Sequence, residues 1–208
     1  MRTQALVPLL MLLALPRLAV GLPLISEVFY DAAGSDDGKG FVELYGAAGT
    51  VLDDFVIQGV NGSNGAITPS VTLSGVIPAD GIFVVADQRS DGSSDVLGAD
   101  LFGNFDFQNG PDSVELLAPD GSVLDALGYG VFAAGDVFAG EGSPAPDAPS
   151  DQALARWFAN VDSDDNALDF TVALPTPGSA PIAVPEPSTA TLVGLGLAGL
   201  AHRRRRRR

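Results

Sequence analysis

Between residues 22 and 178 the chain alternates short apolar runs with glycine-containing turns, and no long segment repeats apolar residues every 3.6 positions. Pairs such as Asn61-Gly62 and Asp120-Gly121 favour turns that need a positive φ. The runs are rich in Val, Ile, Leu and aromatic residues, which favour strands. They predict strands over 24–30, 41–45, 55–60, 66–73, 82–86, 113–117, 123–127 and 153–158, with a hairpin closed around 119–121. Short, regularly spaced strands predict an all-β fold, either a sandwich or a barrel.

Several of these runs, taken in order, resemble the bacterial lamin-tail domain. The matching pieces begin with LISEVFYD (24–31), KGFVELYG (39–46) and LDDFVIQGVNG (52–62), and end with RWFANVDSDDNALDFTVALPTPG (156–178). The resemblance implies a compact Ig-like β-sandwich over residues 22–178. Lamin-tail domains are interaction modules that accompany exported proteins and some secreted hydrolases in bacteria. Their motif contains no catalytic residues, so the resemblance implies a fold and not a reaction.

The first 21 residues have the pattern of a secretory signal peptide. Arg2 supplies a positive charge, residues 5–15 are mostly apolar, and Ala19-Val20-Gly21 supplies the small residues that a signal peptidase needs. The alternative is a buried first helix. The pattern predicts export through the secretion machinery and removal of residues 1–21.

The C-terminal end has three consecutive parts. Val184-Pro185-Glu186-Pro187 is followed by an apolar stretch over 189–201 and then by the run Arg203, Arg204, Arg205, Arg206, Arg207 and Arg208. As a helix the apolar stretch measures ~20 Å, short of a ~30 Å hydrocarbon core, although terminal Arg side chains can extend the span. The Arg run holds that end in the cytoplasm. With a cleaved signal peptide at the other end, the acidic domain is left outside.

This C-terminal pattern closely resembles the PEP-CTERM sorting signal of Gram-negative bacteria, here residues 185–208 after a linker over 179–184. The resemblance implies recognition by an exosortase and removal of the hydrophobic end. It also implies contact with the inner membrane before processing, and a final place at the cell surface or in an exopolysaccharide matrix. A plain C-terminal membrane anchor is the alternative.

Charge and composition exclude several functions for the middle of the chain. Between the two ends only Lys39, Arg89 and Arg156 are basic, against 25 acidic residues, so this part carries a net charge of about −22. Such a surface repels nucleic acid and attracts cations. The chain has no Cys, and its one His, His202, lies in the tail. Catalytic triads, Cys-His dyads and His-ligated zinc are therefore excluded in the domain, and we expect it not to be an enzyme.

The densest group of carboxylates is the segment 162–169. Oxygen ligands at short spacing in a loop suit calcium, which takes 6–8 of them, and crowded carboxylates repel one another until a divalent ion binds. The loop lacks the Gly and distal Glu of an EF-hand, and a second acidic loop, with Asp31, Asp36 and Asp37, would add ligands if it lay nearby. The alternative is a solvated loop with a turn cap. The candidate calcium ligands are Asp162, Asp164, Asp165, Asn166 and Asp169.

Together these patterns predict an exported, non-enzymatic cell-surface or matrix protein with no permanent cofactor, processed by exosortase and associated with exopolysaccharide. One alternative is a carbohydrate- or calcium-dependent binding module, and another is a secreted hydrolase of unrecognised type. Phe102, Phe105 and Phe107 flank polar residues and suit either stacking on sugar rings or packing within a loop. Packing is the favoured interpretation there, as it is for Trp157.

Overall fold

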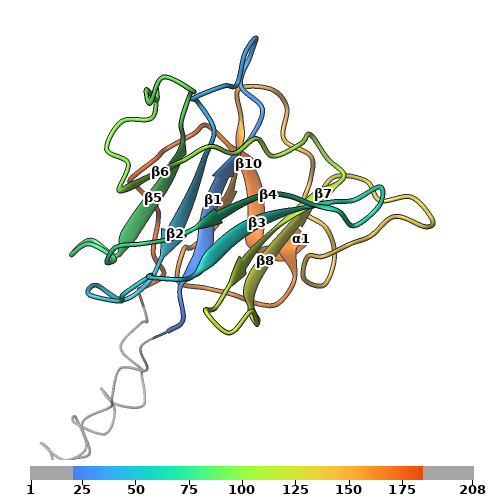
Figure 1. Cartoon of the computed structure of the whole chain (residues 1–208). Coiled ribbons are helices and arrows are strands. Elements are labelled where there is room, and N and C mark those ends of the chain that lie inside the picture. The colour runs from blue at the N-terminus through green and yellow to red at the C-terminus, as the bar shows by residue number, and fades with distance from the viewer. Residues whose placement is uncertain (1–20, 185–208) are drawn as a thin grey trace, which may run out of the picture.

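The computed structural model describes residues 21–184, which form two β-sheets (Figure 1). The six-stranded sheet has the order β10-β9-β1-β2-β5-β6 and the four-stranded sheet the order β4-β3-β7-β8. All neighbouring strands are antiparallel except β5 and β6. The elements are β1 (Leu24–Phe29), β2 (Phe41–Tyr45), β3 (Val56–Asn61), β4 (Ile67–Thr72), β5 (Ile82–Asp87), β6 (Leu101–Gly103), β7 (Asp112–Leu117), β8 (Val123–Tyr129), β9 (Ala153–Arg156), α1 (Asn166–Asp169) and β10 (Phe170–Ala173). The described part of the chain is therefore all-β, as predicted.

The main core lies between the sheets. Alternate residues of a strand point to opposite faces, and in β2 Val42 and Leu44 point inward to meet side chains of the other sheet, such as Ile57 and Leu116. Phe41 points to the outer face of the six-stranded sheet, where it belongs to a second apolar cluster. The six-stranded sheet is thus buried on both faces, which explains why every residue of β5 is buried.

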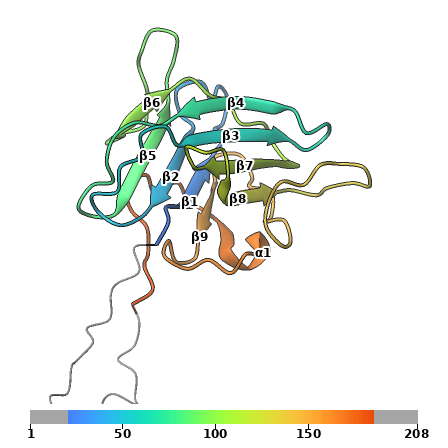
Figure 2. The same ribbon diagram turned by 60° about the horizontal axis from the view of Figure 1, so that its bottom comes forward.

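Three segments cover the outer face, and one of them is the loop after β1, which contributes Ala32. Val96 and Ala99 come from the loop between β5 and β6, and Ala180 comes from the segment after β10. Hydrogen bonds hold that C-terminal segment, residues 174–183, against the domain from Thr176 to Ala183. We call residues 174–183 the strap. Figures 1 and 2 both show that the C-terminal end of the described chain lies at the same end of the domain as the start of β1.

The sequence located most of the strands. All eight predicted strands are present, with ends within two residues of the predicted ones, and the hairpin around 119–121 joins β7 to β8. Two short strands, β6 and β10, were missed. The last predicted strand is too long, because β9 ends at Arg156 and leaves Trp157 and Phe158 exposed. The expectation that Trp157 packs within a strand is therefore wrong.

The predicted terminal signals fall largely outside the described residues, which include only Gly21 of the signal peptide and Val184, the first residue of the Val184-Pro185-Glu186-Pro187 run. Within residues 21–184 there is no helix long and apolar enough to cross a membrane. The predicted hydrophobic helix of the tail lies outside this range.

Candidate functional site

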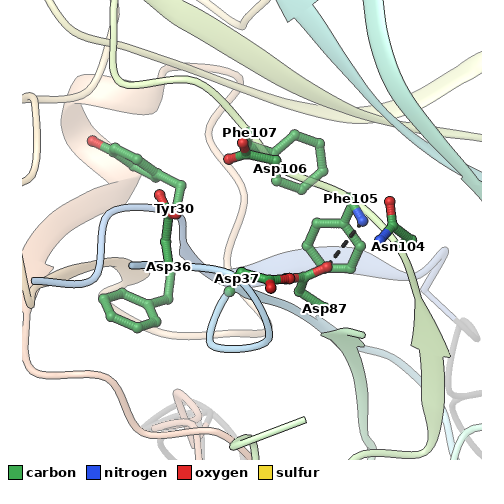
Figure 3. A pocket seen from close by; sticks show the side chains of 10 residues that line it. Tyr30, Asp36, Asp37, Asp87, Asn104, Phe105, Asp106 and Phe107 are labelled. Carbon is green, nitrogen blue, oxygen red and sulfur yellow. Dashed lines mark hydrogen bonds between the residues drawn. The ribbon is translucent and has the colours of Figure 1, made fainter. Parts of the chain in front are cut away.

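An acidic cavity of about 290 Å³ opens at one end of the sandwich (Figure 3). Its polar lining comes from three segments: the loop between β1 and β2, the end of β5, and the segment after β6. Figure 3 shows Asp36 and Asp37 on the first of these and Asn104 to Phe107 on the last. The lining residues are Phe29, Tyr30, Asp36, Asp37, Gly40, Asp87, Asn104, Phe105, Asp106 and Phe107.

Asp87 fixes the geometry of this cavity. It is the last residue of β5 and is buried. Its carboxylate accepts a hydrogen bond from the backbone N–H of Gly38 at 2.5 Å and another from that of Phe105 at 3.0 Å. One side chain therefore joins the two loops that carry the other acidic residues.

The aromatic residues form the inner wall of the cavity. Phe105 and Phe107 are buried and pack on each other, with ring centroids 5.0 Å apart. The favoured interpretation, packing within the loop, is confirmed for these two residues, whereas Phe102 is exposed. The polar groups that line the rest of the cavity include the carboxylates and Asn104.

The cavity is strongly anionic. Burial raises the pKa of Asp106, and the nearby charges of Asp36, Asp87 and Asp37 raise that pKa further. These three neighbouring carboxylates therefore destabilise the ionised form of Asp106. A cation, or a ligand that donates several hydrogen bonds, would relieve this repulsion.

The predicted calcium loop surrounds a buried arginine. The side chain of Arg156 has no exposed area, and its guanidinium donates to Asp125 at 2.9 and 3.0 Å and to Asp169 at 2.8 Å. A longer bond of 3.2 Å reaches Asp162. Asp125 lies on β8 and also accepts from the N–H of Ile25 on β1, so this ion pair joins the two sheets.

The five predicted ligands have separate roles in the structure. Asp165 caps α1, where it accepts from the N–H of Ala167, and Asp164 lies in the exposed part of the loop. Asn166 is buried and bonds the backbone of Ala126 and Gly128 on β8. Asp162 and Asp169 accept from Arg156. The second acidic loop contributes Asp36 and Asp37 to the cavity instead of to this region. Calcium binding by these five residues stays a prediction.

The structure brings Asp162 to two carboxylates that sequence reasoning did not connect with it. One oxygen each of Asp125, Glu141 and Asp162 lies within 4.8 Å of the others. Glu141 Oε2 is buried and has no hydrogen-bond partner within residues 21–184. Burial and the charges of Asp125 and Asp162 raise the pKa of Glu141 to about 7. The sequence offered one signal for this group of carboxylates: Asp125 is an acidic residue inside the apolar run VLDALGY.

Residues 183–207 match the family model of the PEP-CTERM protein-sorting motif, in agreement with the predicted sorting signal. No curated protein and no solved structure matches the chain. The motif defines a class, the exported proteins that exosortase sorts at the membrane and that reach the cell surface. In this chain an acidic all-β domain is followed directly by that motif.

Proposed function

We propose that this chain is a non-enzymatic protein of the cell surface or extracellular matrix, and that its β-domain is an interaction module of the lamin-tail, Ig-like type. Two facing sheets and the order of the matching sequence pieces support this fold. The lack of His and Cys in the domain supports a binding role over a catalytic one.

The acidic cavity is the observation that carries the binding role. Its volume of about 290 Å³ is at the lower end of the volumes that ligand pockets have, and it suits one sugar ring. Carboxylates and Asn104 accept and donate hydrogen bonds to hydroxyl groups, and the anionic lining favours a saccharide that carries amino groups. A matrix saccharide is therefore the proposed ligand.

Calorimetry with the full chain tests this role. The probes are a cationic amino-sugar oligomer (chitosan oligosaccharide), a neutral oligomer (cello-oligosaccharide) and an anionic one (oligogalacturonate). We expect affinity to fall in that order, and we expect Asp106→Asn to weaken binding of the cationic probe at least tenfold. Asp54→Asn removes the same charge outside the cavity and is the matched control. If Asp106→Asn leaves binding unchanged, the cavity is not the binding site. Turnover of any probe would refute the non-enzymatic role.

The route to the surface has its own test. We infer that the hydrophobic tail is inserted in the inner membrane until exosortase removes it, after which the domain reaches the matrix. The intact mass of protein recovered from the cell exterior should lack residues 1–21 and the apolar, Arg-rich end. A mass that retains residues 189–208 would mean that the tail is a lasting anchor.

Calcium binding is a second candidate function, favoured by the unpartnered oxygen of Glu141. Together with Asp125 and Asp162 it offers three hard oxygen ligands of the kind that calcium takes. Arg156 balances only part of the charge of the carboxylates around it. A divalent ion would supply the missing positive charge.

A further inference from the structure

Exposed apolar side chains gather where the chain leaves the domain. These residues are Trp157, Phe158, Val161, Ile182 and Val184, with exposed fractions between 41% and 78%. We call these five residues the exit patch. Contiguous exposed apolar surface of this kind marks an interaction site more often than isolated exposed residues do.

Hydrogen bonds show that the two parts of the exit patch lie side by side. Ala159 donates its N–H to the carbonyl of Pro181 at 2.8 Å. The side chain of Asn160 donates to the carbonyl of Ala183 at 2.9 Å and accepts from the N–H of Ala183 at 2.7 Å. The turn that carries Trp157, Phe158 and Val161 is thereby fastened to the last residues of the strap.

The strap is also held further back along the chain. The carboxylate of Glu27 accepts from the N–H and the hydroxyl of Thr176 at 2.9 and 2.8 Å, and that of Glu43 accepts from the N–H of Gly178 at 2.8 Å. The exit patch therefore has a fixed place on the domain. Figure 2 shows that the strap leaves the domain at one end, together with the N-terminal residues of β1.

The length of chain after the strap fixes how close this surface is to a membrane. Only five residues, 184–188, separate Ala183 from Thr189, where the apolar stretch 189–201 begins. The six Cα–Cα steps between these two residues span at most ~22 Å even when fully extended. When the apolar stretch is in the bilayer, the exit patch is therefore the part of the domain that faces the lipid.

The chemistry of the patch suits the interfacial layer of a bilayer. Tryptophan and other aromatic side chains concentrate at the boundary between headgroups and acyl chains, where aliphatic side chains also bury apolar area. Asp162 and Asp164 lie one and three residues after Val161, and their charges disfavour an anionic surface. A neutral phospholipid surface is therefore the partner with matching chemistry.

We propose that the exit patch docks on the neutral phospholipid surface of the membrane that holds the sorting tail, so that the domain rests on the bilayer while the tail awaits processing. This inference depends on the proposed membrane stage of sorting. It assigns the opposite end of the domain, where the β1–β2 loop and the acidic cavity lie, to the side away from the lipid (Figure 1).

The chain has one tryptophan, so Trp157 reports on the patch directly. The full chain is reconstituted in vesicles of phosphatidylcholine and phosphatidylethanolamine that contain a lipid with a quencher at a shallow acyl position. We expect Trp157 emission to shift to the blue and to be quenched by this lipid, and aqueous iodide to quench it at least twofold less than in a sample without vesicles. Replacing part of the phosphatidylcholine with phosphatidylglycerol should reduce the lipid quenching.

One double variant tests the patch, with one matched control. Phe158→Ser combined with Ile182→Ser should reduce lipid quenching of Trp157 at least twofold without changing the thermal unfolding midpoint, since both residues are exposed. Leu97→Ser removes an equally apolar exposed side chain from the loop between β5 and β6 and should leave the quenching unchanged.

Flotation of the same vesicles separates the possible failures. A chain that floats with the vesicles but whose Trp157 stays accessible to iodide and untouched by the lipid quencher overturns the docking inference alone. A chain that does not float overturns the proposed membrane stage and the inference with it. Protection of Trp157 that needs co-reconstituted exosortase would mean that the patch contacts the enzyme, which also overturns docking on lipid.

Discussion

Replacing Glu27 with Gln is expected to raise the free energy of unfolding at pH 8 relative to the wild type, and to leave it almost unchanged at pH 4. Glu27 lies opposite Glu43 on β1 and β2, and both carboxylates are buried on the outer face of the six-stranded sheet. Burial raises the pKa of Glu27 from 4.5 to about 7, and the nearby charge of Glu43 adds to the shift. Burial also raises the pKa of Glu43.

The sign and the size of the effect follow from this shift. Between pH 4.5 and about 7 the folded state binds more protons at Glu27 than the unfolded state does. The contribution of Glu27 to stability is therefore complete below pH 4.5 and is lost as the pH rises through 7. A shift of the Glu27 pKa from 4.5 to about 7 corresponds to a loss of about 3 kcal/mol in the free energy of unfolding by pH 8.

Urea unfolding of the wild type and of Glu27→Gln at pH 4, 6 and 8 measures this loss. The amide keeps an oxygen to accept from the N–H of Thr176 and has no charge to desolvate. The difference between the two proteins should change by about 3 kcal/mol from pH 4 to pH 8, in favour of the variant. Glu115→Gln, at a partly exposed position on β7 of the other sheet, is the control. A difference that is constant with pH would refute the argument that burial raises this pKa.

Three other changes have expected outcomes. Arg156→Met should lower the free energy of unfolding by about 3–5 kcal/mol at pH 7, because it leaves Asp125 buried without a counterion, and urea unfolding should show a smaller loss at pH 4. Millimolar calcium should raise the unfolding temperature by several degrees, and Glu141→Gln should abolish this rise; a rise that persists in the variant would place calcium elsewhere. Gly59→Ala should cost about 1–3 kcal/mol by thermal unfolding, because a Cβ there would lie 2.1 Å from the carbonyl oxygen of Thr68; an unchanged midpoint would show that the β3–β4 pair adjusts freely.

The strands were predictable because their signals are local. Turn residues bracket each of the eight predicted runs, and the turn at 119–121 alone indicates which two strands pair. β6 has only three residues, and its bonding to β5 depends on a loop of more than ten residues. The extent of β9 was overestimated because the apolar run continues past Arg156 into exposed Trp157 and Phe158. Residue type alone does not report where hydrogen bonding to the neighbouring strand ends.

The candidate sites were less predictable because they depend on contacts between distant residues. The Asp-rich loop was recognised from its composition, but Asp125 lies 31 residues from Arg156, and Ile25 lies 100 residues from Asp125. The acidic cavity likewise joins residues of three separate segments. Two signals were available in the sequence: Asp125 interrupts an apolar strand, and Arg156 is the last basic residue before the tail. Each indicates a buried charge, but neither identifies its partner.

The same hydrogen bonds that place the strap also determine how the sorting motif is presented. Asn160 holds Ala183 by two hydrogen bonds, and Pro185 follows only two residues later. Val184, the last described residue, is one Cα–Cα step of ~3.8 Å from Ala183, and the Pro-Glu-Pro sequence follows it directly in the chain. An enzyme that reads this motif on the folded chain must come into contact with the domain or wait until the strap is released. The fold of residues 21–184 is therefore part of the sorting signal's environment, even though the matched motif is confined to residues 183–207.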